Sequence, residues 1–339
     1  MRQTVRKLKN PRTLGALILG AIAFAALLSF ADVRKVAVAF SYFPPLFIPL
    51  LFGLVVGREA VRMVEWRFLL GPLQLRPKWC HTAEAIVSGD FAQILPGGIF
   101  FQNYVLKETE AEDISTTLGA TMVMQFAEAV VALLVLAVVA VPGWWWLRWA
   151  AVAVMAGFGL FLALLTRPAV LSWLKERGTH SKLSGWIAGQ LEGFLASIEL
   201  LLTPWIIVRA LALTAASMAF TIAGLYVITR AYTPPDLAWL QVAVIYCFVL
   251  AVIVLNPLPS DWGVSEALGV AMFTSFRVDP ATGLTMMLLL RFSILIGTLL
   301  LTVMLGLLFS GDAARIAGWR RHSARLNSQD QPRPARRSI

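Results

Sequence analysis

The amino-acid sequence predicts an all-α polytopic membrane protein, and three observations carry this prediction. Hydrophobic residues make up 58% of the 339 residues and charged residues only 14%, too few to give a soluble domain of this size a polar surface. Apolar runs of about the length that crosses a bilayer recur along the chain. Shorter apolar pieces between them end at proline and glycine. We therefore expect about seven long helices, with shorter half-helices between some of them.

Each expected element corresponds to one apolar run. Long helices are predicted at 13–31, 37–57, 116–141, 149–166, 204–230, 237–256 and 281–309. The shorter pieces, which do not each reach the roughly 20 residues of a full crossing, lie at 82–95, 98–106 and 262–276. The run after the basic segment 1–12 is too long for the apolar part of a signal peptide, so we expect it to remain as the first helix.

Positive charges predict the orientation. The net charge of +10 is typical of cytoplasmic loops that face anionic lipid, and no basic domain stands apart to bind nucleic acid. Lysine and arginine gather in 58–78, where Arg58 and Arg62 are assigned to a cytoplasmic connection, in 167–182 and in 315–337. We expect an integral protein of the plasma (inner) membrane with both termini in the cytoplasm.

The same orientation constrains the short pieces. For the charged connections to lie inside, 82–106 must enter and leave on the cytoplasmic face, and 237–276 must do so on the outer face. Two re-entrant hairpins from opposite faces are what an inverted repeat produces. The sequence thus predicts one transmembrane domain, 13–309, with repeat halves at about 13–141 and 149–309. The basic, proline-containing tail, 310–339, is expected to be disordered near lipid headgroups.

The tips of the two hairpins form most of the predicted binding site. Non-helical backbone at membrane depth is tolerated only inside protein or beside a watery cavity, so two tips predict a polar cavity near the midplane. A half-helix that begins there directs backbone N–H groups at an anion. The same residues also serve simply as turn and N-cap residues. They are Pro96, Gly97 and Gly98 in the first hairpin, and Asn256, Pro259, Ser260 and Asp261 in the second.

Ionisable residues within the apolar runs complete the candidate site, because a charge in hydrocarbon usually faces a cavity or a partner. Glu266 and Arg291 suggest a cavity pair in which the guanidinium meets a lipid phosphate through two oxygens. The alternative is a permanent ion pair that fixes the second hairpin. Glu128, in the middle of its span, is assigned to a polar pathway or to a protonated carboxyl bonded to a neighbouring helix. Asp90 has a structural interpretation of the same kind, and Arg209 can snorkel to the surface.

Two segments resemble a known family. LNPLPSDWGVSEALG and the span after it are similar to the C-terminal signature of the lysylphosphatidylglycerol synthase transmembrane (flippase-like) family, a PGGxGxxE segment followed by an arginine-bearing helix. Pro259, Gly263, Glu266 and Arg291 fall on those positions. FAQILPGGIFFQNYVLKE resembles the family's first-half LLPGxxGD segment at Pro96 and Gly97. The resemblance implies a lipid-handling membrane domain.

The chain departs from this pattern at three places. Ser260 and Asp261 stand where the family has glycines, the region Phe100–Asn103 replaces an aspartate and an arginine, and Gln125–Phe126 replaces a Glu-Arg pair. These changes predict a different headgroup or an accessory role. The aminoacyl-transferring domain of the full synthases is not expected in this chain.

The functional prediction is a lipid flippase or transporter that binds an anionic or polyprenyl-linked headgroup between the hairpins. A second interpretation is a non-transporting membrane partner of a lipid-modifying or glycosyl-transferring enzyme. An intramembrane enzyme that uses Glu128, Asp261 and Glu266 as acids is a weaker third. Nucleotide, metal-protease and hydrolase motifs are absent from the sequence, so we expect no enzyme activity, no cofactor and no metal.

Overall fold

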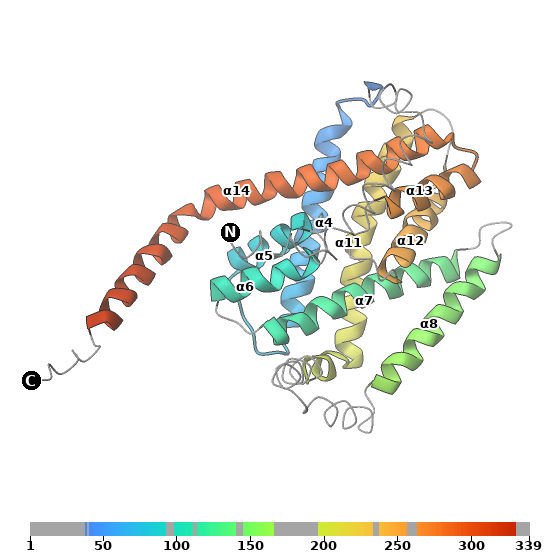
Figure 1. The fold of residues 1–339 in the computed structure, drawn as a ribbon. Coiled ribbons are helices and arrows are strands. Elements are labelled where there is room, and N and C mark those ends of the chain that lie inside the picture. The colour runs from blue at the N-terminus through green and yellow to red at the C-terminus, as the bar shows by residue number, and fades with distance from the viewer. Residues whose placement is uncertain are drawn as a thin grey trace, which may run out of the picture.

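The computed structural model describes residues 38, 41–92, 98–110, 114–139, 145–165, 196–232, 237–255 and 263–329. Within these ranges the chain is helical and contains no strand (Figure 1). The helices are α4 (Phe47–Leu70), α5 (Trp79–Ala92), the 3-10 turn η1 (Gly98–Phe100), α6 (Phe101–Glu110), α7 (Ile114–Val138), α8 (Trp145–Leu165), α11 (Pro204–Ala231), α12 (Trp239–Leu255), α13 (Val264–Ser275) and α14 (Pro280–Gln329). The expected first helix at 13–31 lies outside the described residues.

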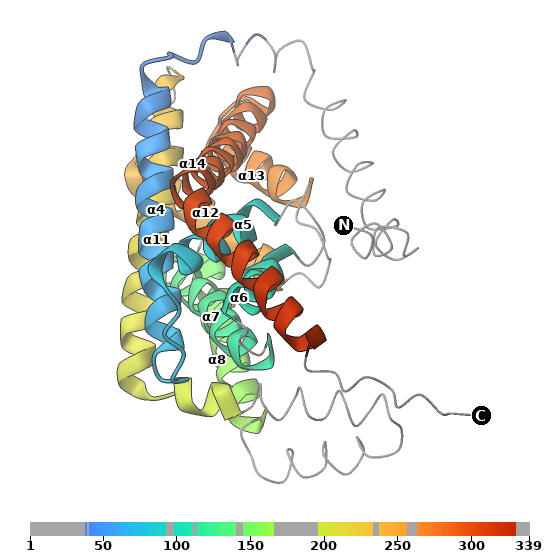
Figure 2. The same ribbon diagram turned by 90° about the vertical axis from the view of Figure 1, so that its left-hand side faces the viewer.

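Helices α4 and α11 form the centre of the bundle. They lie side by side and run in opposite directions (Figure 2). Close approach depends on small residues: a Cβ at Gly57 of α4 would lie 2.5 Å from the Phe220 ring of α11, and one at Gly297 of α14 would lie 2.7 Å from Val55. Such contacts let helix backbones approach in a membrane, where dispersion rather than water exclusion drives packing.

The helix contacts repeat between the two halves. If α4, α5, α6 and α7 correspond to α11, α12, α13 and α14, then each described contact in one half has a counterpart in the other. Thus α5 packs on α6 and on α14, and α12 packs on α13 and on α7. Likewise α4 contacts both α7 and α14, and so does α11. This pattern is compatible with two intertwined copies of one unit, and the division into inverted repeats stays a prediction.

The expected hairpins fall on α5 and α6 in the first half and on α12 and α13 in the second, and their re-entrant course stays a prediction. α5 and α6, of 14 and 10 residues, pack together in the first half, and α13, of 12 residues, follows the longer α12 in the second. Three of these helices, α5, α6 and α13, are each too short to cross the bilayer completely. The tip residues 93–97 and 256–262 lie outside the described residues. Gly263 is the N-cap residue before α13, and its φ of 81° favours glycine.

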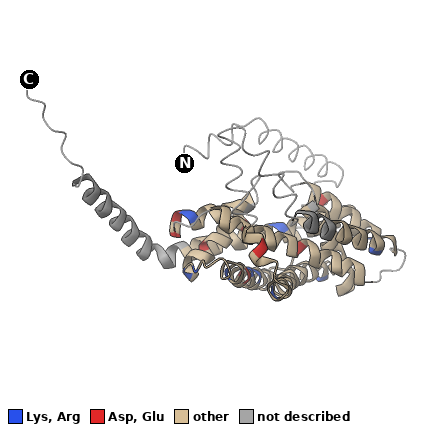
Figure 3. Cartoon of the chain, turned by 90° about the horizontal axis from the view of Figure 1, so that it is seen from below, with Lys and Arg blue, Asp and Glu red and all other residues tan. Residues whose placement is uncertain are grey.

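Three described helices are long and apolar enough to cross a membrane by length and composition: Ile114–Val138, Pro204–Ala231 and the Pro280–Leu305 part of α14. The helix Trp239–Val254 is apolar but shorter. Lys, Arg, Asp and Glu residues are sparse along the described helices of the bundle (Figure 3). Trp145, Trp146 and Trp149 at the start of α8 are exposed, as in an interfacial aromatic belt.

The position of α4 differs from the prediction. The expected span was 37–57, with Arg58 and Arg62 in a cytoplasmic connection after it. Instead α4 covers Phe47–Leu70 and carries both arginines along its length, with Arg62 only 3% exposed. The assignment of these two residues to a loop is therefore wrong. Carboxylates on other helices compensate their charge, and such long-range partners are invisible in a local apolar pattern.

The C-terminal helix is also longer than expected. α14 continues to Gln329, so it includes most of the segment for which the sequence predicts disorder. Alanine and arginine recur in that segment, and these are strong helix formers even without packing. Residues 330–339 lie outside the described part of the chain.

Candidate functional site

The second half of the site is an ion pair between α13 and α14. Arg291 donates from Nη1 to Oε1 of Glu266 at 2.5 Å. The structure thus brings together two residues that the sequence analysis paired. Arg291 is the twelfth residue of the span Pro280–Leu305, far from either end of it. Its side chain keeps 18% exposure, whereas that of Glu266 keeps 1%. The cation is therefore the more accessible partner.

Glu266 is held by its own helix as well. Its Oε2 accepts the backbone N–H of Gly263 at 2.7 Å and the hydroxyl of Ser265 at 2.9 Å. These donors cap the first turn of α13 and stabilise the carboxylate independently of Arg291. The carboxylate is thus fixed at the start of the half-helix, next to the tip 256–262, and it positions the guanidinium.

Asn256, Pro259, Ser260 and Asp261 lie outside the described residues, as do Pro96 and Gly97. Gly98 is described, in η1, and is buried.

The first half holds a larger buried network on α4, α5 and α7. Asp90 of α5 accepts from Arg58 at 2.8 Å and lies 3.3 Å from Nε of Arg62. Arg62 also donates to Glu128 of α7. Asp90 is therefore the shared counter-ion of two guanidiniums, and Glu128 is bonded to the neighbouring helix α4 through Arg62.

Two more carboxyls of α4 belong to this network. Glu59 contacts Arg58 through Oε1, and Glu65 accepts the hydroxyl of Thr214 on α11. Both glutamates are almost fully buried, with 4% and 1% exposure. The network thus holds four carboxyls and two guanidiniums in the interior of the bundle, and Glu65 bonds a hydroxyl of α11 rather than an arginine.

Sequence reasoning missed Glu59 and Glu65 and misplaced Arg58 and Arg62. A signal was present: Arg58, Arg62 and Glu65 are spaced at i, i+4 and i+7, which puts them on one face of a helix. Charged residues at that spacing directly after an apolar run indicate a helix that continues with a buried polar face. Arg209, in contrast, is exposed and its guanidinium lies 4.2 Å from the ring of Trp205, as expected for a snorkelling residue.

A neutral cluster occupies the place where the family resemblance leads us to expect charge. Gln102 of α6 donates to the hydroxyl of Thr121 on α7 at 2.7 Å, and this hydroxyl donates to the side-chain oxygen of Asn103 at 2.9 Å. All three residues are buried, and a Cβ at Gly89 would lie 2.8 Å from Gln102. Amides and a hydroxyl thus hold the first hairpin against α7 without a formal charge.

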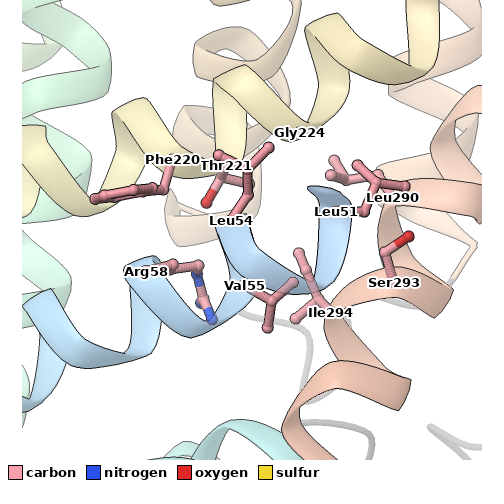
Figure 4. Close-up of a pocket in the computed structure, with 10 residues that line it drawn as sticks. All are labelled: Leu51, Leu54, Val55, Arg58, Phe220, Thr221, Gly224, Leu290, Ser293 and Ile294. Carbon is pink, nitrogen blue, oxygen red and sulfur yellow. The ribbon is translucent and has the colours of Figure 1, made fainter. Parts of the chain in front are cut away.

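A small pocket lies between α4, α11 and α14 (Figure 4). Its lining is mostly aliphatic, with Thr221 and Ser293 among the polar exceptions. Arg58 also lines it, but the guanidinium points away from the pocket, toward α5 (Figure 4). The pocket sits beside the central helix pair rather than between the hairpins, so it does not correspond to the predicted headgroup cavity.

Comparison with known proteins places this arrangement in a family. The chain matches the family model of the lysylphosphatidylglycerol synthase transmembrane region over residues 13–302. No curated protein matches the chain. The matched region contains both hairpins, the buried network and the Glu266–Arg291 pair. It is the membrane part of those synthases, which implies a membrane domain involved in lipid handling. The chain belongs to the lysylphosphatidylglycerol synthase transmembrane family.

Proposed function

We propose that this protein binds the headgroup of an anionic or polyprenyl-linked lipid between its two hairpins and moves it across the bilayer. The Glu266–Arg291 pair is the observation that carries the proposal. A guanidinium in the middle of an apolar span is costly unless it has a partner or a task. Here the partner is fixed and buried while the cation stays more accessible.

Three features of the pair suit an anionic ligand. The guanidinium offers five N–H donors in a planar fork that matches phosphate oxygens. Glu266 keeps two donors of its own helix, so it stays stabilised when Arg291 turns toward a phosphate. The pair also adjoins the N-terminus of α13, where the helix dipole favours an anion. The lipid tails would remain in the bilayer while one repeat rocks against the other.

Reconstitution tests the proposal. Purified protein is placed in liposomes with headgroup-labelled lipids of several classes, and movement between leaflets is followed. Arg291→Ala should slow movement of the preferred lipid by about 10- to 100-fold, the equivalent of one or two charge-assisted hydrogen bonds. Arg291→Lys should retain part of the rate. Arg209→Ala is the matched control, because that arginine is exposed and stacks on Trp205; it should leave the rate unchanged.

Two results would contradict transport. If no lipid class moves but the protein co-purifies with a lipid-modifying or glycosyl-transferring enzyme, the partner role holds instead. If Glu266→Gln and Arg291→Met each unfold the protein while the double variant folds and still moves lipid, the pair is only structural.

A further inference from the structure

We propose that the buried network on α4, α5 and α7 is a proton-binding site, with exchangeable protons held at Glu59 and Glu65. If proton transfer at this site is coupled to lipid movement, a proton gradient would drive that movement. This second step rests on the proposed transport function. The proton site itself is argued from charge balance, hydrogen-bond geometry and burial.

Charge balance comes first. The network contains four carboxyls, Glu59, Glu65, Asp90 and Glu128, and two guanidiniums, Arg58 and Arg62. If all six were ionised, the interior would carry two uncompensated negative charges. Burying an unpaired charge costs several kcal/mol. A buried carboxyl avoids this cost when it takes up a proton and becomes neutral. Two protons restore neutrality.

Hydrogen-bond geometry shows which carboxyls are short of positive partners. Asp90 contacts both guanidiniums, and Glu128 contacts Arg62. In contrast, Oε2 of Glu59 is buried and has no hydrogen-bond donor among the described residues, and Oε1 of Glu59 shares Arg58 with Asp90. A buried carboxylate oxygen that lacks a donor is costly, whereas the protonated carboxyl carries no charge. A proton on Glu59 removes this cost.

Glu65 is the second proton carrier. It accepts the hydroxyl of Thr214, a neutral donor, and Arg62 one turn earlier is already engaged by Asp90 and Glu128. A hydroxyl compensates less than a full charge, so a buried carboxyl with such a partner favours its neutral form.

The surroundings of the two glutamates define what can change their protonation. Beyond the six groups of the network, α12 contributes Tyr246, which interacts with Glu128 and Arg58, and α11 contributes the Thr214 hydroxyl. On α14, which also packs against α4, Arg291 is engaged by Glu266. A hinge motion of α5 would separate Asp90 from Arg58 and so change the need for a proton on Glu59.

Infrared spectroscopy of the purified protein tests the proton site directly. A protonated carboxyl has a C=O band distinct from that of a carboxylate. The wild-type protein should show this band at neutral pH, and the band should shift in heavy water because the protons exchange. Glu59→Gln and Glu65→Gln should each remove about half of it and the double variant all of it, because glutamine mimics a neutral carboxyl. Exposed Glu84 provides the control: Glu84→Gln should leave the band intact.

Stability gives an independent check. Glutamine replaces a protonated glutamate with nearly the same shape and hydrogen bonds, so both variants should keep the wild-type thermal midpoint. If the wild-type band is absent at neutral pH, if it persists in the double variant, or if either single variant fails to fold, these glutamates are ionised and the proposal is wrong.

Liposomes with a pH gradient test the coupling. One pH unit should bias the lipid distribution by up to about tenfold for each proton exchanged, and the double glutamine variant should show no bias. A bias that survives in that variant contradicts the coupling. If the wild-type protein moves no lipid, transport itself fails, whereas the infrared band still decides whether the protons are there.

Discussion

The two halves of this protein treat buried charge in different ways. In the second half one carboxylate and one guanidinium form a pair, and the carboxylate is also capped by its own helix. In the first half two guanidiniums contact three carboxyls across three helices, and Asp90 bridges both arginines. A pair with an accessible cation can release its charge to a ligand. A buried network of many partners can instead hold protons and join helices together.

The largest expected effect is on the shared counter-ion of the network. Asp90→Ala leaves two buried guanidiniums with less compensation, and breaking a buried ion pair in this way costs about 3–5 kcal/mol. Thermal unfolding in detergent, followed by tryptophan fluorescence, measures the loss. Glu84→Gln, on the same helix but exposed, is the control and should have no effect. A loss as small as that of the control would mean that water reaches the network.

The pair should be less costly to break than the network. Arg291→Met leaves Glu266 with two other donors, and Glu266→Gln leaves a cation that is 18% exposed, so each should cost about 1–3 kcal/mol. Because Glu266 and Arg291 are each other's partners, the double variant should regain part of the lost free energy of unfolding. The corresponding double change in the network, Arg62→Met with Glu128→Gln, should not recover, since it also removes a partner of Asp90. If the Arg291/Glu266 and Arg62/Glu128 double variants recover stability equally, the two halves do not differ in how they stabilise buried charge.

Part of this comparison could be predicted from the sequence. Apolar runs were enough to predict the helical bundle, and chain breakers between them predicted short helices, because hydrophobic length and chain breakers act locally. Glu266 and Arg291 could be paired because each is isolated in an apolar run. The network could not be predicted, since Arg58 and Arg62 follow the apolar run like ordinary loop charges, and their partners Asp90 and Glu128 are distant in sequence. Ion pairs between separate helices depend on packing, which no local pattern records.

Packing at the centre of the bundle can be tested at glycines of one helix. Gly57→Ala places a methyl group 2.5 Å from the Phe220 ring, and overpacking of this kind typically costs about 1–3 kcal/mol. Gly53 of the same helix has nothing within 4 Å, so Gly53→Ala is a matched control and should be neutral or stabilising by about 0.5–1 kcal/mol. If Gly57→Ala is as well tolerated as Gly53→Ala, then α4 and α11 do not need this close contact.

The smallest effect is expected at the open end of the first hairpin. Glu110 accepts from the Lys78 amide at 3.0 Å and contacts Nδ1 of His81 at 2.6 Å. Burial alone would raise the pKa of Glu110, but the Lys78 amide and His81 together hold this pKa below its ordinary value of 4.5. Because the pKa of Glu110 is lower in the folded protein, Glu110 contributes to stability at pH values above its unfolded-state pKa. This contribution is lost as the pH falls through its folded-state pKa.

Glu110→Gln should therefore lower the thermal midpoint slightly at neutral pH and not at all in strong acid. If the variant differs from the wild-type midpoint by the same amount at both pH values, the charge of Glu110 does not hold the end of α6 to the start of α5. Of its charged contacts, the first hairpin would then depend only on the buried ones that join α5 to α4.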